Sequence, residues 1–126
     1  MICKYLNYHF KIITVVLNNT IFIMNLGYAY IVSNQNRTVF YTGVTNDIYR
    51  RTHEHKSGEG SVFTKRYKLT DLVYYEFFDD IRDAIQREKE LKNWHRPWKI
   101  RLITENNAQM KDLAFTELGF NPNDYK

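Results

Sequence analysis

The chain has 126 residues, of which 44% are hydrophobic and 25% charged, an ordinary composition for one globular domain. Its formal net charge of +4 favours polyanionic partners only mildly. The single cysteine, Cys3, excludes an intrachain disulfide, disfavours a structural zinc site and is typical of a cytoplasmic protein.

The first 24 residues differ in composition from the rest of the chain. Their apolar stretch is interrupted by Thr14, Asn18 and Thr20, so it is too short and too polar for a membrane-spanning helix, which needs about 20 apolar residues. A regular pattern of strands and helices begins only after Met24. We therefore expect residues 1–24 to be an extension outside the domain, with Met24 a candidate for the natural start. An additional strand is the alternative.

Two β-rich runs follow, at residues 28–32 and 38–43. The polar sequence SNQNR separates them, and two such runs across a short polar loop predict an antiparallel hairpin. Gly43 is expected to end the second strand.

A helix is predicted directly after this hairpin. Thr45 or Asn46 can cap it, and Asp47 would lie in its first turn, where the helix dipole favours a negative charge. The helix is expected to reach about Lys56, because Gly58 fits a C-terminal cap.

The rest of the chain alternates in the same way. Residues 61–68 read as a basic, aromatic connector and residues 72–78 as a third strand. A helix is predicted over 79–94, with acids at its start and bases later. Another helix is predicted over 97–105, because a proline is tolerated in the first turn.

The predicted order is β-β-α-β-α-α. This order predicts an α/β (α+β) fold with a small three-stranded antiparallel sheet flanked by helices. The domain is expected to occupy residues 25–105, followed by an irregular tail over 106–126.

The predicted helix over 79–94 carries a carboxylate on its apolar side. Ile81, Ala84, Ile85 and Leu91 form the stripe, and Glu88 falls on it. An ionised carboxylate on a core-facing stripe costs several kcal/mol unless something pairs with it. Glu88 either sits at the edge of the stripe and turns to water, or lies in a cleft where it can bind a divalent metal ion.

The helix that ends near Lys56 poses a matching question. Arg51 and His55 share a face with Ile48, because residues three, four and seven positions apart are neighbours on a helix. Ile48 is expected to face the core, so Arg51 and His55 lie along the sheet-facing side. Arg50 and His53 are interpreted as solvated. A solvated basic face remains the alternative for Arg51 and His55.

No single one of these residues identifies a function, but their order and spacing do. Tyr28-Ala29-Tyr30, then Tyr41-Thr42-Gly43, then Arg51, His55 and Glu88 resemble the GIY-YIG nuclease family. The two triplets stand where the family has its GIY and YIG motifs, and the resemblance covers about Leu26 to Leu113. It is strongest to small single-domain proteins similar to the nuclease domain of the excision-repair endonuclease subunit.

The resemblance implies a role for each residue. Tyr30 and Tyr41 match the two motif tyrosines, one of which would be the general base. Arg51 matches the essential arginine, His55 a histidine found in part of the family, and Glu88 the glutamate that binds a divalent metal ion, Mg²⁺ or Mn²⁺.

Three further residues belong to the same comparison. Tyr28 and Gly43 complete the two motifs and are interpreted as structural, since a strand tyrosine usually fills the core and glycine often ends a strand. Asn107 stands near the family's late asparagine, at a loose spacing.

The connector over 61–68 is expected to contact nucleic acid through Lys65, Arg66 and Lys68. Trp94 and Trp98 are four residues apart and are expected to pack together. The resemblance thus implies a metal-dependent endonuclease, with DNA favoured over RNA as the substrate, in DNA repair or in the processing of branched or single-stranded substrates. The partner would be nucleic acid, without a membrane or a small-molecule cofactor. The alternative is a nucleic-acid-binding module of the same fold with little or no activity.

Overall fold

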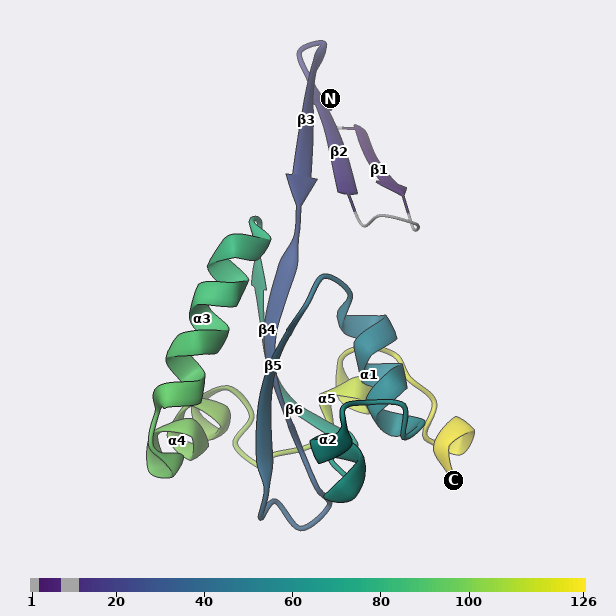
Figure 1. Ribbon diagram of the computed structural model, residues 1–126. Coiled ribbons are helices and arrows are strands. Elements are labelled where there is room, and N and C mark those ends of the chain that lie inside the picture. Colours follow the sequence, from purple (N-terminus) through teal and green to yellow (C-terminus); the bar gives the residue numbers. More distant parts are fainter. Residues whose placement is uncertain (1–2, 8–11) are drawn as a thin grey trace.

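The centre of the fold is a three-stranded antiparallel sheet with the strand order β5-β4-β6. The computed structural model describes residues 3–7 and 12–126 (Figure 1). Its elements are β1 (Cys3–Asn7), β2 (Ile12–Leu17), β3 (Thr20–Asn25), β4 (Gly27–Ser33), β5 (Phe40–Thr45), α1 (Ile48–Lys56), α2 (Val62–Arg66), β6 (Asp71–Phe78), α3 (Ile81–Asn93), α4 (Arg96–Asn106), α5 (Leu113–Thr116) and a final 3₁₀ turn, η1 (Pro122–Tyr125). The predicted fold class and the order of the main elements are confirmed.

Strand β4 lies in the middle of the sheet, and its residues pair with both neighbours. Tyr30 is opposite Gly43 on β5 and opposite Tyr75 on β6. The second strand does not end at Gly43 as predicted, because the pairing continues to Thr45. Gly43 is therefore an interior strand residue directly across from a motif tyrosine.

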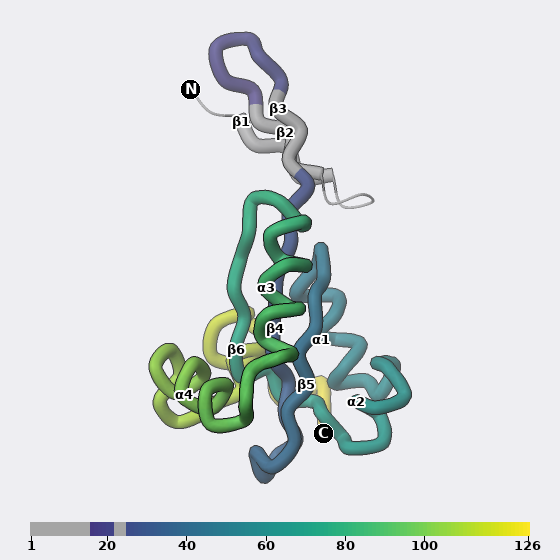
Figure 2. Tube along the Cα trace, turned by 60° about the vertical axis from the view of Figure 1, so that its left-hand side comes forward, coloured from purple at the N-terminus to yellow at the C-terminus, as the bar shows by residue number. Residues whose placement is uncertain are grey.

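The two faces of the sheet are covered by different helices, as Figures 1 and 2 show. Alternate residues of a strand point to opposite faces. Ala29 and Ile31 pack in one cluster with Leu91 of α3 and Ile103 of α4. The second cluster holds Tyr30, Val32, Ile48, Leu69, Leu72 and Leu113, and it lies toward α1 and α5. Strand β5 is an edge strand between these two layers.

The helix ends differ from prediction in detail. Asp47 is the N-cap of α1, and its side chain accepts a hydrogen bond from the Arg50 amide, while Thr45 Oγ1 donates to the Asp47 carbonyl. The prediction that Thr45 or Asn46 caps this helix was wrong. Gly58 follows the helix with a φ of +74°, in the left-handed region that favours glycine, as expected.

Helix α3 buries a narrower stripe than predicted. Ala84 and Leu91 are fully buried and Glu88 is 7% exposed, whereas Ile85 is 36% exposed. Ile85 was wrongly placed on the core stripe, because it directly follows the buried Ala84 and so points about 100° away from it around the helix. Gly27 allows the close packing of this helix, since a Cβ there would come within 2.9 Å of the Ala84 Cβ.

The connector and the tail contain more structure than their sequences suggested. The connector forms α2, whose N-cap is Ser61. The tail forms α5 and η1 instead of an irregular segment. A buried ion pair between Lys56 and Asp112 joins α1 to the start of α5, and this long-range contact explains why local sequence patterns missed the tail.

The described residues before β4 form a second antiparallel sheet in the order β1-β2-β3. Figure 1 shows this sheet beyond the end of β4, which it reaches through β3 and Leu26. These residues thus form strands, as the alternative of an additional strand supposed. Residues 1–2 and 8–11 lie outside the described part. None of the three strands joins the β5-β4-β6 sheet in the described ranges. The domain boundary near Met24 stays a prediction.

Within the described ranges, no helix has both the length and the apolar character that crossing a bilayer requires.

Candidate active site

The site is centred on a contact between the sheet and α1. The hydroxyl group of Tyr30 on β4 and Nε2 of His55 on α1 are joined by a buried hydrogen bond of 2.9 Å. His55 faces the sheet because it lies one and two turns from Thr52 and Ile48, which are also buried. The interpretation of His55 as part of a solvated face is therefore excluded.

Gly43 makes room for the ring of Tyr30. A Cβ at Gly43 would come within 2.5 Å of Cζ and of the hydroxyl oxygen of Tyr30. The tyrosine ring thus lies across the glycine of the neighbouring strand, and any larger residue would displace its hydroxyl group. The motif glycine is needed for this cross-strand contact, not to end the strand.

Both members of the hydrogen-bonded pair are held neutral. Burial raises the pKa of the Tyr30 hydroxyl well above its usual value, and the nearby Arg51 only partly opposes this effect. Burial, followed by the charge of Arg51, lowers the pKa of His55 to about 4. The imidazole is therefore uncharged at neutral pH, and the ring nitrogen that carries no proton can accept a hydrogen bond.

Arg51 and Arg50 are neighbours in the sequence but differ in their surroundings. Arg51 pairs with Glu54 at 3.1 Å, and its Nε is a buried donor without a partner among the described residues. Arg50 is 49% exposed, and its guanidinium bonds Asn46 and Glu54 at the surface. Of these two arginines, Arg51 is the one with a guanidinium nitrogen that bonds no other described residue, and a guanidinium donor suits a phosphate oxygen.

Glu88 approaches the same place from the other face of the sheet. Its carboxylate is nearly buried and forms an ion pair with Lys92, one turn later on α3. The ammonium group of Lys92 lies 5.9 Å from the ring centroid of Tyr41 on the edge strand β5. The Tyr41 ring in turn lies 6.3 Å from the His55 ring. Glu88 also acts electrostatically on Tyr30, whose pKa it helps to raise.

The edge strand explains how residues from two separate layers can meet. Tyr41 and Gly43 belong to β5, which has a hydrogen-bonded neighbour on one side only. Helices α1 and α3 flank this strand from opposite faces (Figures 1 and 2). Arg51 and His55 therefore reach the strand from one face and Glu88 from the other, around its open side.

Glu88 could supply one carboxylate ligand to a hard divalent cation bound together with substrate. The described residues contain no cluster of three or more metal-ligating side chains. Mg²⁺ is commonly bound in this way, through one or two carboxylates with water and substrate phosphates completing its coordination. Lys92 is 51% exposed and can turn to water when another cation takes its place.

Comparison with known proteins identifies the family of this chain. The GIY-YIG catalytic domain family matches residues 26–101. The chain belongs to this family. It is 39% identical to a UPF0213 protein of Staphylococcus saprophyticus over 82 residues, which are 65% of this chain and 99% of the relative. It is also 40% identical to a UPF0213 protein of Natronomonas pharaonis over 81 residues, 64% of this chain and 94% of the relative.

A solved structure is also similar. The solution NMR structure of a UPF0213 protein from Bacillus halodurans matches with 29% identity and a TM-score of 0.46, covering 69% of this chain and 92% of that one. Membership of the GIY-YIG family implies nuclease-like activity on a nucleic-acid substrate, and GIY-YIG nucleases typically use a divalent metal ion.

Tyr28 and Asn107, two further residues of the resemblance, contact other parts of the domain. Tyr28 packs against Phe77 and Tyr75, with ring centroids 5.4 and 6.4 Å away. The side chain of Asn107 donates to the carbonyls of Val73 and Lys111 and accepts from the Lys111 amide. The amide of Asn107 is thus occupied by backbone groups, which gives this residue a structural explanation.

Lys65, Arg66 and Lys68 lie on or next to α2 and are exposed, as nucleic-acid contacts should be. None of the three forms an ion pair within the described part of the chain. The predicted contact between Trp94 and Trp98 is present, with ring centroids 6.2 Å apart.

Sequence reasoning missed Lys92 and Phe63. Lys92 is four residues after Glu88, a spacing that places two charges side by side on a helix, so the pair could have been expected. Phe63 packs on Tyr41 at a centroid distance of 6.1 Å. The turn of α2 that places it there was not predicted.

Proposed function

We propose that this GIY-YIG protein is a metal-dependent endonuclease that hydrolyses phosphodiester bonds in DNA, with branched or single-stranded DNA as its substrates in repair or processing. The observation that carries the proposal is the buried Tyr30–His55 hydrogen bond beside Arg51, whose Nε has no partner in the described ranges. Hydrolysis needs a base for water and donors for a phosphate that gains negative charge. These three side chains supply both.

Tyr30 is the better candidate of the two tyrosines for the general base. Its raised pKa means that it cannot act as a preformed phenolate. It can instead take a proton from the attacking water while its own proton passes to Nε2 of the neutral His55, 2.9 Å away. The water oxygen then forms the new bond to phosphorus, the bond to the leaving oxygen breaks, and that oxygen takes a proton from solvent. His55 returns the proton that it received to solvent, which its lowered pKa favours.

Arg51 would bind the phosphate through its free Nε–H and stabilise the charge that develops on the phosphate oxygens. Glu88 would hold the divalent metal ion, Mg²⁺ or Mn²⁺. Such an ion supplies charge neutralisation at the phosphate and at the leaving oxygen. Tyr41 lies between His55 and Lys92 and would line the path of the substrate.

One observation favours a second candidate, a nucleic-acid-binding module with little activity. Lys92 already neutralises Glu88, and an arrangement in which an ammonium group replaced the metal ion would bind a phosphate without cleaving it. The two candidates differ in their response to metal.

A cleavage assay separates them. Branched, single-stranded and duplex DNA should be incubated with the protein, with and without Mg²⁺ or Mn²⁺, beside the variant Glu88→Gln. We expect metal-dependent cleavage by the wild type and none by the variant. DNA binding without cleavage under all these conditions would favour the binding module.

A further inference from the structure

Helix α2 extends an aromatic surface away from the candidate active site. The ring of Phe63 lies 6.1 Å from Tyr41, with 31° between the ring planes, and 4.7 Å from Tyr67. Phe63 is 43% exposed and Tyr67 40% exposed, whereas the buried residue of α2 is Thr64. These two rings therefore lead outward from a motif tyrosine and leave much of their surface to solvent.

A cleft of about 570 Å³ borders this aromatic surface. One wall is the β4–β5 turn, and the other is the end of α1 with the segment that follows it toward β6. The lining residues are Asn34, Gln35, Asn36, His55, Lys56, Ser57, Gly58, Gly60, Thr64, Lys65, Tyr67, Lys68 and Thr70. Because His55 belongs to this lining and also bonds Tyr30, the cleft adjoins the site of the proposed chemistry.

The charge of the cleft is positive. No Asp or Glu is among the described residues that line it. Lys65 and Lys68 form no ion pair with any described carboxylate, whereas Lys56 is occupied by Asp112. The guanidinium of Arg66 lies 5.6 Å from the centroid of the Tyr67 ring. Free cations thus alternate with exposed rings along one short segment.

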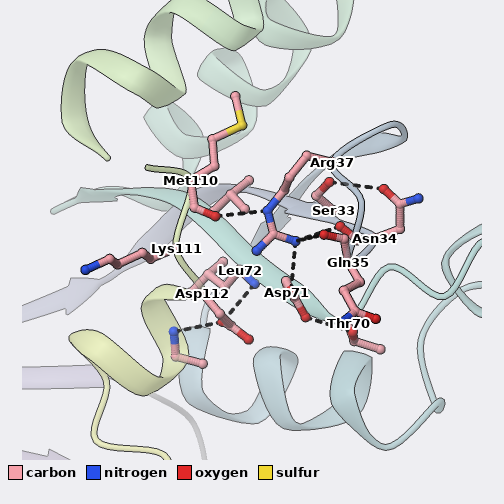
Figure 3. Close-up of polar contacts among 12 residues, drawn as sticks. Ser33, Asn34, Gln35, Arg37, Thr70, Asp71, Leu72, Met110, Lys111 and Asp112 are labelled. Carbon is pink, nitrogen blue, oxygen red and sulfur yellow. Dashed lines mark hydrogen bonds and ion pairs between the residues drawn. The ribbon is translucent and has the colours of Figure 1, made fainter. Parts of the chain in front are cut away.

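The opposite wall is connected to β6 and to the segment before α5 by hydrogen bonds of Arg37, which Figure 3 shows. Its guanidinium donates to the Asn34 carbonyl at 2.6 Å, to Asp71 at 2.8 Å and to the Met110 carbonyl at 2.9 Å. These bonds tie the β4–β5 turn to β6 and to the segment before α5. The cleft is therefore formed in advance, which lowers the entropic cost of binding.

We propose that Phe63 and Tyr67 stack against unpaired bases of a DNA strand that leaves the active site across α2, while Lys65 and Lys68 contact its phosphates. This inference rests on the proposed function, because it assigns the path of that nuclease's substrate. Exposed aromatic rings interleaved with cations bind single strands, whose bases present free faces. A duplex stacks its bases internally and cannot use the rings, although it can still meet the cations.

The test measures binding in the presence of a chelator, so that no substrate is cut. Fluorescence anisotropy compares a labelled dT15 oligonucleotide with a hairpin duplex. We expect Phe63→Ala and Tyr67→Ala each to weaken binding of dT15 by about tenfold and to change duplex binding less than about twofold. Val62→Ala is the matched control, because Val62 is on the same helix, apolar and 85% exposed, and it should change neither affinity.

Phe63→Tyr should keep the wild-type affinity for dT15, unlike Phe63→Ala, because stacking needs the aromatic ring and not its substituent. Equal losses for dT15 and duplex, or losses below about twofold for both, would overturn the stacking surface. Cleavage by the wild type is scored separately with Mg²⁺. A selective loss of dT15 binding in a protein that cuts nothing would support the stacking surface and overturn the nuclease. Cleavage without a selective loss of dT15 binding would support the nuclease and overturn the stacking surface.

Discussion

Replacing Glu88 with glutamine tests whether its carboxylate serves a metal ion or only the fold. The side chain of Glu88 is 10% exposed and its ion-pair partner, Lys92, is 51% exposed. Glutamine keeps the volume and removes the charge. The consequences for stability and for cleavage then depend on different properties of the same group.

The effect on stability should be small. An ion pair between residues one turn apart with a solvated member contributes about 0.3–0.5 kcal/mol. The desolvation of the carboxylate opposes this contribution, and Lys92 can return to water, so that no unpaired charge stays buried. We expect a change within about 1 kcal/mol, or about 3–5 °C in melting temperature for a chain of this size. Breaking a fully buried pair would cost about 3–5 kcal/mol instead.

Cleavage should fall by at least about 100-fold, the usual loss when one stabilising group is removed from an active site. Thermal melts, the cleavage assay and DNA binding under chelation can all be measured on one purified variant. Glu90→Gln is the matched control, since Glu90 is on the same helix and 48% exposed, and it should leave all three unchanged. A large fall in melting temperature, or cleavage at the wild-type rate, would refute the assignment of Glu88 as a metal ligand.

Three further predictions concern α1 and the strand β5 beside it. Arg51→Ala should abolish cleavage, whereas Arg50→Ala should only weaken DNA binding in a salt-dependent way. Equal losses of cleavage in the two variants would mean that both arginines act only as parts of a basic surface. The lowered pKa of His55, about 4 against its ordinary 6.5, means that the unfolded chain binds the proton more tightly. Stability should therefore fall by up to about 3 kcal/mol as the pH drops through this window, and urea unfolding of His55→Gln should show a flatter pH profile. Gly43→Ala should displace the Tyr30 ring, cost about 1–3 kcal/mol and abolish cleavage; a melt that matches the wild type would contradict the close contact.

The order of the elements could be predicted because each one is bounded by its own turn and cap residues. The errors lie where a distant contact decides. Strand β5 continues beyond Gly43 because its backbone pairs with β4 up to Thr45, and the small residue at position 43 makes room for the Tyr30 ring instead of ending the strand. The tail is structured because Asp112 pairs with Lys56, 56 positions earlier. A local sequence pattern contains only one of the two partners of such a contact.

The candidate site divides in the same way. Helical spacing placed Arg51 and His55 on one face, but it could not supply the hydrogen bond to Tyr30, which requires α1 to lie on the sheet. The apolar stripe of α3 identified Glu88 as a residue that needs a partner. Glu88 reaches the residues of α1 around the edge strand β5. This position depends on how the helices pack on the two faces of the sheet, which spacing along the chain does not reveal.

The amino-terminal sheet provides the last test. A protein that begins at Met24 would lose β1, β2 and most of β3, but it would keep Leu26 and Gly27, which are buried in the domain. No strand of the lost sheet pairs with β5-β4-β6 among the described residues, and Ile21 in β3 is 66% exposed. We therefore expect the shortened protein to melt within a few degrees of the full chain, to bind DNA and to cut it at the same rate. An insoluble product, or a melting temperature lower by more than about 10 °C, would mean that several kcal/mol of the domain's stability comes from contacts with this sheet.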